Sequence, residues 1–215
     1  MTDAHNTPVP RTAADVLTTG RTALLLWDLQ NGLGGQSPQL AELSVVWQRL
    51  REAARDAGVL IVRSRHVAPR PELMDPVERW RVTRRTHGEN RPEHYMQPGG
   101  LDSAFIPGFE PEPYELVVDK GAPSLFHDTE ADHRLRAAGV TNLVLAGVAT
   151  DIGIDFTARH AMALGYFPVV AEDAVGAFTP AAHEAAMTIL RSFTFTASSQ
   201  EIVSIWSTGG AAGLT

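Results

Sequence analysis

Short apolar runs alternate along the chain with longer stretches of helical periodicity. The apolar runs, which read as strands buried on both faces, lie at 22–28, 59–64, 115–120, 142–147, 167–173 and 193–197. Helical patterns separate most of them, at 38–57, 128–139, 148–165 and 180–192. Gly58 and Gly139 are typical helix stop signals, and Asp128 is a candidate N-cap. This order predicts an α/β fold, with a doubly wound, mostly parallel sheet and helices on both faces in three Rossmann-like layers.

A long stretch at 67–113 interrupts this alternation. It is rich in Pro, Gly, Arg and His and has no sustained periodicity. Segments of this length without clear structure are usually functional or form lids, although a plain surface insertion is equally expected from the composition. We predict a domain at 21–208 that carries an irregular insert or lid at 67–113 and follows a flexible N-terminal arm at 1–20.

The composition narrows the function chiefly by what it lacks. The 215 residues include no cysteine, which excludes disulfides, thiolate nucleophiles and cysteine-ligated zinc. A formal net charge of −7 argues against sequence-independent nucleic-acid binding. No apolar run approaches the ~20 residues of a membrane span, and the polar N-terminal segment is unlike a secretory signal. We expect a cytoplasmic protein with a small-molecule substrate and neither a nucleic-acid nor a membrane partner.

Polar residues stand where three of the predicted strands end. Asp28 ends the first strand, Lys120 ends the third, and the turn 148–151 follows the fourth. Ligands of open parallel sheets bind beyond the carboxyl ends of the strands, so these residues are candidates for one site. Each has a structural alternative. Asp28 could cap a loop, Lys120 could be solvated, and Asp151 could be the N-cap of a helix beginning near Ile152.

Four segments resemble, in order, the signatures of the isochorismatase-like hydrolase superfamily: WDLQNGL, VVDKGAPSLFHDT, LVLAGVATDIGIDFTARHAMALGY and VVAEDAVGAFTPAAHEAAMTIL. The resemblance runs from about 22 to 197 and is weakest through the insert. It implies a six-stranded parallel sheet, a homodimer or higher homo-oligomer, and a cis peptide between Val148 and Ala149. Most members are amidases with an Asp, Lys and Cys triad. The first two correspond to Asp28 and Lys120, whereas the cysteine position is Gly153, as in true isochorismatases.

The resemblance implies hydrolysis of an enol-pyruvyl (vinyl) ether, with Asp28 as general acid, Lys120 stabilising negative charge and Gly153 at the nucleophile position. A nearby ammonium favours the carboxylate form of an Asp and thus a base role, whereas burial and a dianionic substrate favour the protonated form, so acid and base both remain open. Expected substrate contacts are Trp27, Gln30, Arg79, Trp80, Arg81, Phe126, Val148, Ala149, Thr150 and Asp151. Arg84, Arg85 and Arg91 also belong to the insert. A solvated basic face and core aromatics are the alternative interpretations.

No metal or cofactor is expected. His66, His87 and His94 have spacings that match no established ligand pattern, and Ser64-Arg65-His66 lacks the leading Asp of zinc-binding relatives. Three functions therefore compete: a vinyl-ether hydrolase, a cysteine-free hydrolase of a small amide or imide that uses water activated by Asp28, and a non-catalytic binding member. The presence of both Asp28 and Lys120 favours an enzyme.

Overall fold

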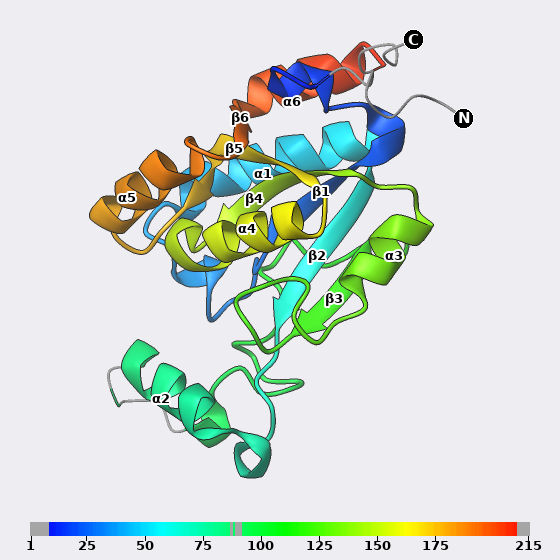
Figure 1. The fold of residues 1–215 in the computed structure, drawn as a ribbon. Helices are drawn as coiled ribbons and strands as arrows, with labels where there is room; N and C mark the ends of the chain where they lie inside the picture. Colours follow the sequence, from blue (N-terminus) through cyan, green and yellow to red (C-terminus); the bar gives the residue numbers. More distant parts are fainter. Residues whose placement is uncertain (1–8, 87, 89–91, 210–215) are drawn as a thin grey trace.

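The computed structural model describes residues 9–86, 88 and 92–209 (Figure 1). Its strands are β1 (Thr22–Trp27), β2 (Leu60–His66), β3 (Leu116–Lys120), β4 (Asn142–Val148), β5 (Phe167–Gly176) and β6 (Phe195–Ala197). Its helices are α1 (Leu40–Asp56), α2 (Pro76–Arg85), α3 (Ala131–Ala137), α4 (Asp155–Ala163), α5 (Pro180–Leu190) and α6 (Ser199–Ser207). The strands form one six-stranded parallel sheet in the order β3-β2-β1-β4-β5-β6, which confirms the predicted fold class.

Helices cover both faces of this sheet and bury a core on each side. Leu24 and Leu26 of β1 belong to the core beneath α1 and α6, whereas Leu25 and Trp27 belong to the core beneath α3, α4 and α5 (Figure 1). Successive side chains of a strand point to opposite faces, so a strand covered on both sides must be apolar throughout. No helix in the described ranges is both long and apolar enough to cross a membrane.

The insert at 67–113 contains a regular helix, α2, that the sequence analysis did not predict. Its N-cap, Asp75, accepts hydrogen bonds from the backbone N–H groups of Val77 (2.7 Å) and Glu78 (2.9 Å), and Glu78 completes a capping box. Only Val82 of this helix is buried, so the apolar stripe that marks a packed helix is missing from its sequence. Figure 1 shows α2 standing away from the sheet.

Three further features differ from the sequence analysis. α6 is an additional helix, begun by a capping box between Ser198 and Glu201. The N-cap of α3 is Glu130, because Asp128 has a left-handed φ of 53° and precedes the helix. Residues 1–8 of the predicted arm lie outside the described residues. Farther along that arm, Val16 and Leu17 are buried in the core, so this part packs against the domain.

A buried ion-pair network ties the end of the insert to the sheet. Glu115 accepts hydrogen bonds from Arg51 of α1 (2.6 Å) and from Arg63 of β2 (3.3 Å), and the side chains of Glu115 and Arg63 are fully buried. Arg63 also donates to the carbonyl of Phe109 in the insert (2.6 Å). Burial lowers the pKa of Arg63 to about 10, and the neighbouring carboxylate of Glu115 opposes this shift.

Replacing Glu115 with Gln is therefore expected to destabilise the fold strongly. Breaking a buried ion pair by neutralising one partner costs about 3 kcal/mol or more, because the other charge remains buried without compensation. Urea unfolding measures the change. Glu112→Gln, an exposed carboxylate in the same loop, is the matched control and is expected to stay near wild-type stability. Equal stability of both variants would show that the network contributes little.

Candidate active site

Residues from four neighbouring strands meet at the carboxyl edge of the sheet. Asp28 directly follows β1, His66 ends β2, Lys120 ends β3 and Ala149 follows β4. His66 pairs in register with Lys120 across β2 and β3. Because β3, β2, β1 and β4 are adjacent and parallel, these four residues form a row at the edge where open α/β sheets bind ligands.

Asp28 and Lys120, which are 92 positions apart, form a buried ion pair. The Lys120 Nζ lies 2.9 Å from Asp28 Oδ2, and both residues are less than a tenth exposed. Ser64 of β2 holds the other carboxylate oxygen: its hydroxyl donates to Asp28 Oδ1 (2.6 Å) and accepts from the Asp28 backbone N–H (2.9 Å). The carboxylate is therefore fixed by a cation on one oxygen and a hydroxyl on the other.

The ammonium of Lys120 is buried and lies over the ring of Trp27. Its nitrogen lies 4.1 Å from the centroid of the Trp27 ring, a cation–π contact. Burial lowers the pKa of Lys120, and the neighbouring carboxylate of Asp28 opposes that shift without overcoming it. The lysine is therefore a desolvated cation with two specific partners, and the alternative of a solvated strand-end lysine is excluded.

The turn after β4 is left-handed and then π-helical. Ala149 has a φ of 61° and is followed by a π-helical turn over Thr150–Ile154. Non-glycine residues with positive φ and π-helical turns are both frequent at functional sites. The expected cis peptide between Val148 and Ala149 is not present: all peptide bonds in the described ranges are trans, and the left-handed Ala149 reverses the chain instead.

The same turn places two predicted residues outside the site. Thr150 is fully buried and its hydroxyl lies 3.1 Å from Nδ1 of His183 in α5. Asp151 is exposed and caps no helix, since the turn begins at Ala149 and α4 begins only at Asp155. The backbone N–H groups of Ile152 and Ile154 are already bonded to the Ala149 carbonyl.

Gly153 lies against the indole of Trp27. A Cβ atom added at Gly153 would overlap Nε1 and Cε2 of this ring and would lie 2.6 Å from Cζ2. Real Cβ atoms do not approach carbon this closely, so glycine is required while Trp27 keeps its place. The space that a side chain at 153 would need is therefore occupied by an aromatic ring from β1.

These residues open onto a cavity of about 810 Å³ between the sheet edge and α2. Of the predicted site residues it is lined by Trp27, Asp28, Trp80, Arg81, Lys120, Val148, Ala149 and Gly153. Arg84 and Arg85 of α2 also line it, and Arg85 lies over the ring of Phe178 in the loop between β5 and α5 (5.3 Å). Four basic side chains line the cavity against two acidic ones, Asp28 and Glu78. The cavity therefore suits an anionic ligand.

Gln30 and Arg79 were predicted to contact the substrate, but their side chains make structural hydrogen bonds to the backbone. Gln30 is fully buried: its Nε2 donates to the carbonyls of His66 (2.9 Å) and Ser103 (2.7 Å), and its Oε1 accepts from the His66 N–H (2.7 Å). Arg79 donates to the carbonyls of Pro71 and Met74 within the insert. Neither residue lines the cavity: Gln30 is bonded to the backbone of β2 and of the insert, and Arg79 to that of the insert.

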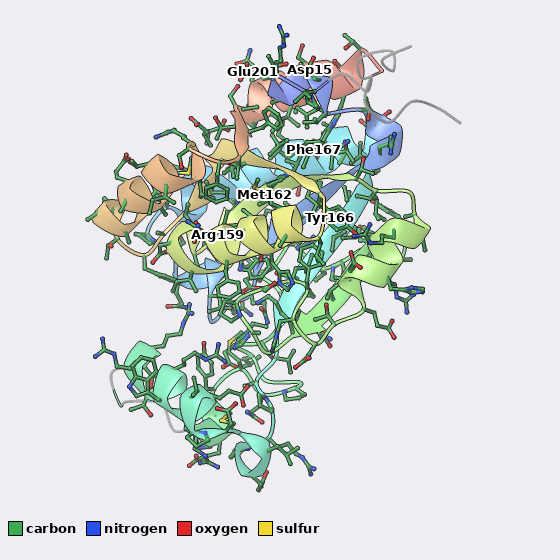
Figure 2. The ribbon with its side chains drawn as sticks, viewed as in Figure 1. Asp15, Arg159, Met162, Tyr166, Phe167 and Glu201 are labelled. Atoms are coloured by element: carbon green, nitrogen blue, oxygen red, sulfur yellow. The ribbon has the colours of Figure 1, made fainter. Side chains whose placement is uncertain are left out.

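Phe126 is also a core residue. It stacks on Tyr166 with the ring centroids 5.6 Å apart and does not line the cavity. Figure 2 labels Tyr166 beside the end of α4, in the body of the domain and far from α2. The alternative interpretation of this aromatic as core is therefore correct.

His66, Ser64 and Tyr95 are the cavity or site residues for which the sequence analysis assigned no role. His66 and Tyr95 line the cavity, and Ser64 holds Asp28. The second strand was predicted to end at residue 64, but β2 continues to His66. With this longer strand, the argument that selected Asp28 at a strand end would also have selected His66. Tyr95 lies in the insert, where no sequence signal places it at the site.

No group of three or more His, Asp or Glu side chains in the described ranges is arranged to hold a metal ion. His87 and Arg91 lie outside the described residues. The described side chains at the site supply a carboxylate, an ammonium, an imidazole and guanidinium groups.

The domain is thus a doubly wound αβα fold with a buried Asp–Lys pair at the carboxyl ends of its strands. The model of the Isochorismatase domain matches residues 22–201. An isochorismatase family protein from Burkholderia thailandensis is similar in structure, with a TM-score of 0.72, 27% identity and coverage of 87% of this chain and 96% of that one. A cysteine hydrolase from Pseudomonas syringae pv. phaseolicola has a TM-score of 0.79 over 95% and 99% of the two chains, and at 21% identity it shows the fold alone.

The chain belongs to the isochorismatase-like hydrolase family. Among curated relatives, the ureidoacrylate amidohydrolase RutB of Variovorax paradoxus is 39% identical over 87 residues, which cover 39% of this chain. The match spans about a third (34%) of that relative's length. The family and fold predicted from the motifs are thereby confirmed.

Proposed function

We propose that the protein is a cysteine-independent hydrolase of a small anionic substrate that cleaves an enol-pyruvyl ether. One observation carries this proposal: the Asp28–Lys120 pair opens onto a cation-lined cavity in which the Trp27 indole fills the space beside Gly153. No thiol is available anywhere in the chain, so a thioester intermediate cannot form. Vinyl-ether hydrolysis needs a proton donor and water but no nucleophilic side chain.

In this reaction Asp28 acts as the general acid. Its carboxyl proton moves to the terminal methylene carbon of the substrate, which becomes a methyl group, and the adjacent carbon becomes an oxocarbenium centre. Lys120 and Ser64 already contact the two oxygens of the carboxylate that remains, so they stabilise the form of Asp28 that proton transfer produces. Water then adds to the centre, and the hemiketal collapses to pyruvate and an alcohol.

The arginines of α2 are suited to bind an anionic substrate. Arg81, Arg84 and Arg85 line the cavity opposite the sheet edge, and guanidinium groups bind carboxylates with two parallel hydrogen bonds. Arg81 donates to the carbonyl of Gly121, which follows β3 (3.4 Å), so α2 is tied to the loop beyond Lys120. A substrate carboxylate held there would leave the ether end to face Asp28.

A second candidate is hydrolysis of a small amide by water that Asp28 activates as a base. The curated relative named as an amidohydrolase supports this candidate. The Asp28 carboxylate, held by Lys120 and Ser64, would then act in its ionised form.

Turnover assays separate the two candidates. The protein is incubated with isochorismate, and pyruvate is coupled to lactate dehydrogenase; small amides are screened in parallel for ammonia release. We expect pyruvate. Ammonia without pyruvate would replace the proposal with the amide candidate, and no product in either assay would reject both for these substrates.

A further inference from the structure

We propose that His66 is a catalytic residue of this site, whose imidazole takes a proton from the water that adds to the substrate. The inference rests on the proposed hydrolysis and extends it. Once Asp28 has protonated the substrate, the attacking water still has to lose a proton, and a group beside Asp28 is needed to receive it.

The position of His66 fits this role. It is the last residue of β2, and β2 lies between β1, which leads to Asp28, and β3, which ends at Lys120. All three residues line the same cavity. The imidazole is therefore placed beside the acid–lysine pair, on the same edge of the sheet.

The strand end that carries His66 is held rigidly. Gln30 binds both its backbone N–H (2.7 Å) and its carbonyl (2.9 Å), and the ring packs against that of Tyr95 with the centroids 5.8 Å apart. Within the described part of the chain, no hydrogen bond engages either ring nitrogen of His66. A fixed backbone and a ring with uncommitted nitrogens are what a group must offer to bind a reacting water in a defined place.

The surrounding charges keep this imidazole neutral. The pKa of His66 is lowered to about 3, chiefly by burial. The positive charges of Lys120, Arg85 and Arg81 lower it further, and the carboxylate of Asp28 opposes the shift. One ring nitrogen therefore has a free lone pair at neutral pH. The imidazolium formed during the reaction is unstable in this setting and returns its proton readily.

Asp28 and His66 together supply and receive every proton that the reaction moves. Water bonds to the oxocarbenium carbon and passes one proton to the His66 ring, which gives the neutral hemiketal. His66 returns that proton to the ether oxygen as the bond from carbon to this oxygen breaks and the alcohol leaves. The hydroxyl proton of the hemiketal goes to the Asp28 carboxylate, which regenerates the acid and leaves a 2-oxo acid.

The other candidates for this proton are already engaged. Glu78 of α2 lines the cavity, but its carboxylate accepts from the Asp75 N–H (3.2 Å) in the capping box and lies 3.9 Å from Arg81. Tyr95 is a poor acceptor, because burial raises the pKa of its hydroxyl and keeps it protonated. Among the described lining residues, His66 alone offers a neutral basic nitrogen.

Three experiments on the 215-residue chain test the assignment. With isochorismate as the probe, His66→Gln is expected to lower kcat about a hundredfold, with KM within a few-fold of wild type and unchanged thermal stability. Free imidazole is expected to restore part of the kcat of His66→Ala. Diethyl pyrocarbonate, which acylates neutral imidazoles, is expected to label His66 at the same rate from pH 5 to 7.5. His133→Gln, an exposed histidine of α3, is the control and should keep wild-type turnover.

The outcomes separate this inference from the proposed function. Wild-type kcat in His66→Gln, no imidazole rescue, or a His66 that does not react with diethyl pyrocarbonate would each overturn the assignment of His66. No pyruvate from the wild-type protein, with His66 labelled as expected, would instead overturn the vinyl-ether reaction.

Discussion

Asp28→Asn is expected to reduce turnover by roughly a hundred- to ten-thousandfold, the range that a general acid or base contributes. The amide keeps the shape of the carboxyl group, and its oxygen can still accept from Lys120, which lies 2.9 Å from Asp28 Oδ2. It cannot deliver a proton to carbon. The measurement is kcat for pyruvate formation from isochorismate, with Asp119→Asn as control. Asp119 precedes Lys120 on β3, but its exposed side chain pairs with Arg65.

Stability measurements distinguish a catalytic pair from a purely structural one. Neutralising one partner leaves the other charge buried and should cost about 3–5 kcal/mol in Asp28→Asn or Lys120→Met alone. The double variant Asp28→Asn with Lys120→Met contains neither charge. It is expected to regain most of the lost stability and to remain inactive. Urea unfolding and the pyruvate assay are run on all four proteins.

Activity in the double variant would contradict the proposal, since a site without its acid and its cation should not turn over. A double variant no more stable than the single ones would show that the two charges are not energetically coupled, despite their contact.

Much of this fold could be predicted because strands buried on both faces leave a strong signal. β1 and β4 are apolar at almost every position, since each residue faces one of two cores. α2 left no such signal, because only Val82 is buried and its stability at the N-terminus comes from Asp75 and Glu78. Capping residues mark where a helix starts, but they carry no periodicity to count.

The site could be predicted to the extent that it follows from topology. Parallel strands place Asp28 and Lys120 at the same edge of the sheet, whatever the 91 residues between them do. The roles of Gln30 and Phe126 depend on which way each side chain points, and Gln30 turns to the insert's backbone while Phe126 turns to the core. A sequence motif places such a residue near the site without fixing its direction.

Gly153→Cys is expected to destabilise the protein by about 3 kcal/mol, the upper end of overpacking costs, because the new Cβ would overlap the Trp27 ring. Trp27 is 1% exposed and lies against Lys120, so a shift of its ring would also disturb its contact with the lysine. Urea unfolding measures the loss. The matched control is Gly20→Cys, where an added Cβ meets no atom within 4 Å and φ is not positive. Gly20→Cys should stay within about 0.5 kcal/mol of wild type.

The indole can be tested as the cause by combining this change with Trp27→Ala. Trp27→Ala alone should cost about 3–5 kcal/mol through the cavity it leaves. In that background Gly153→Cys should cost little, because the added thiol enters the space of the missing ring. The resulting coupling of about 2–3 kcal/mol is at the high end for residues in contact. Additive costs would mean that backbone near the π-helical turn, rather than the ring, rejects a side chain. Coupled losses of stability would mean that the Trp27 ring is the reason for glycine at 153. Introducing a thiol at 153 would then require changing both residues.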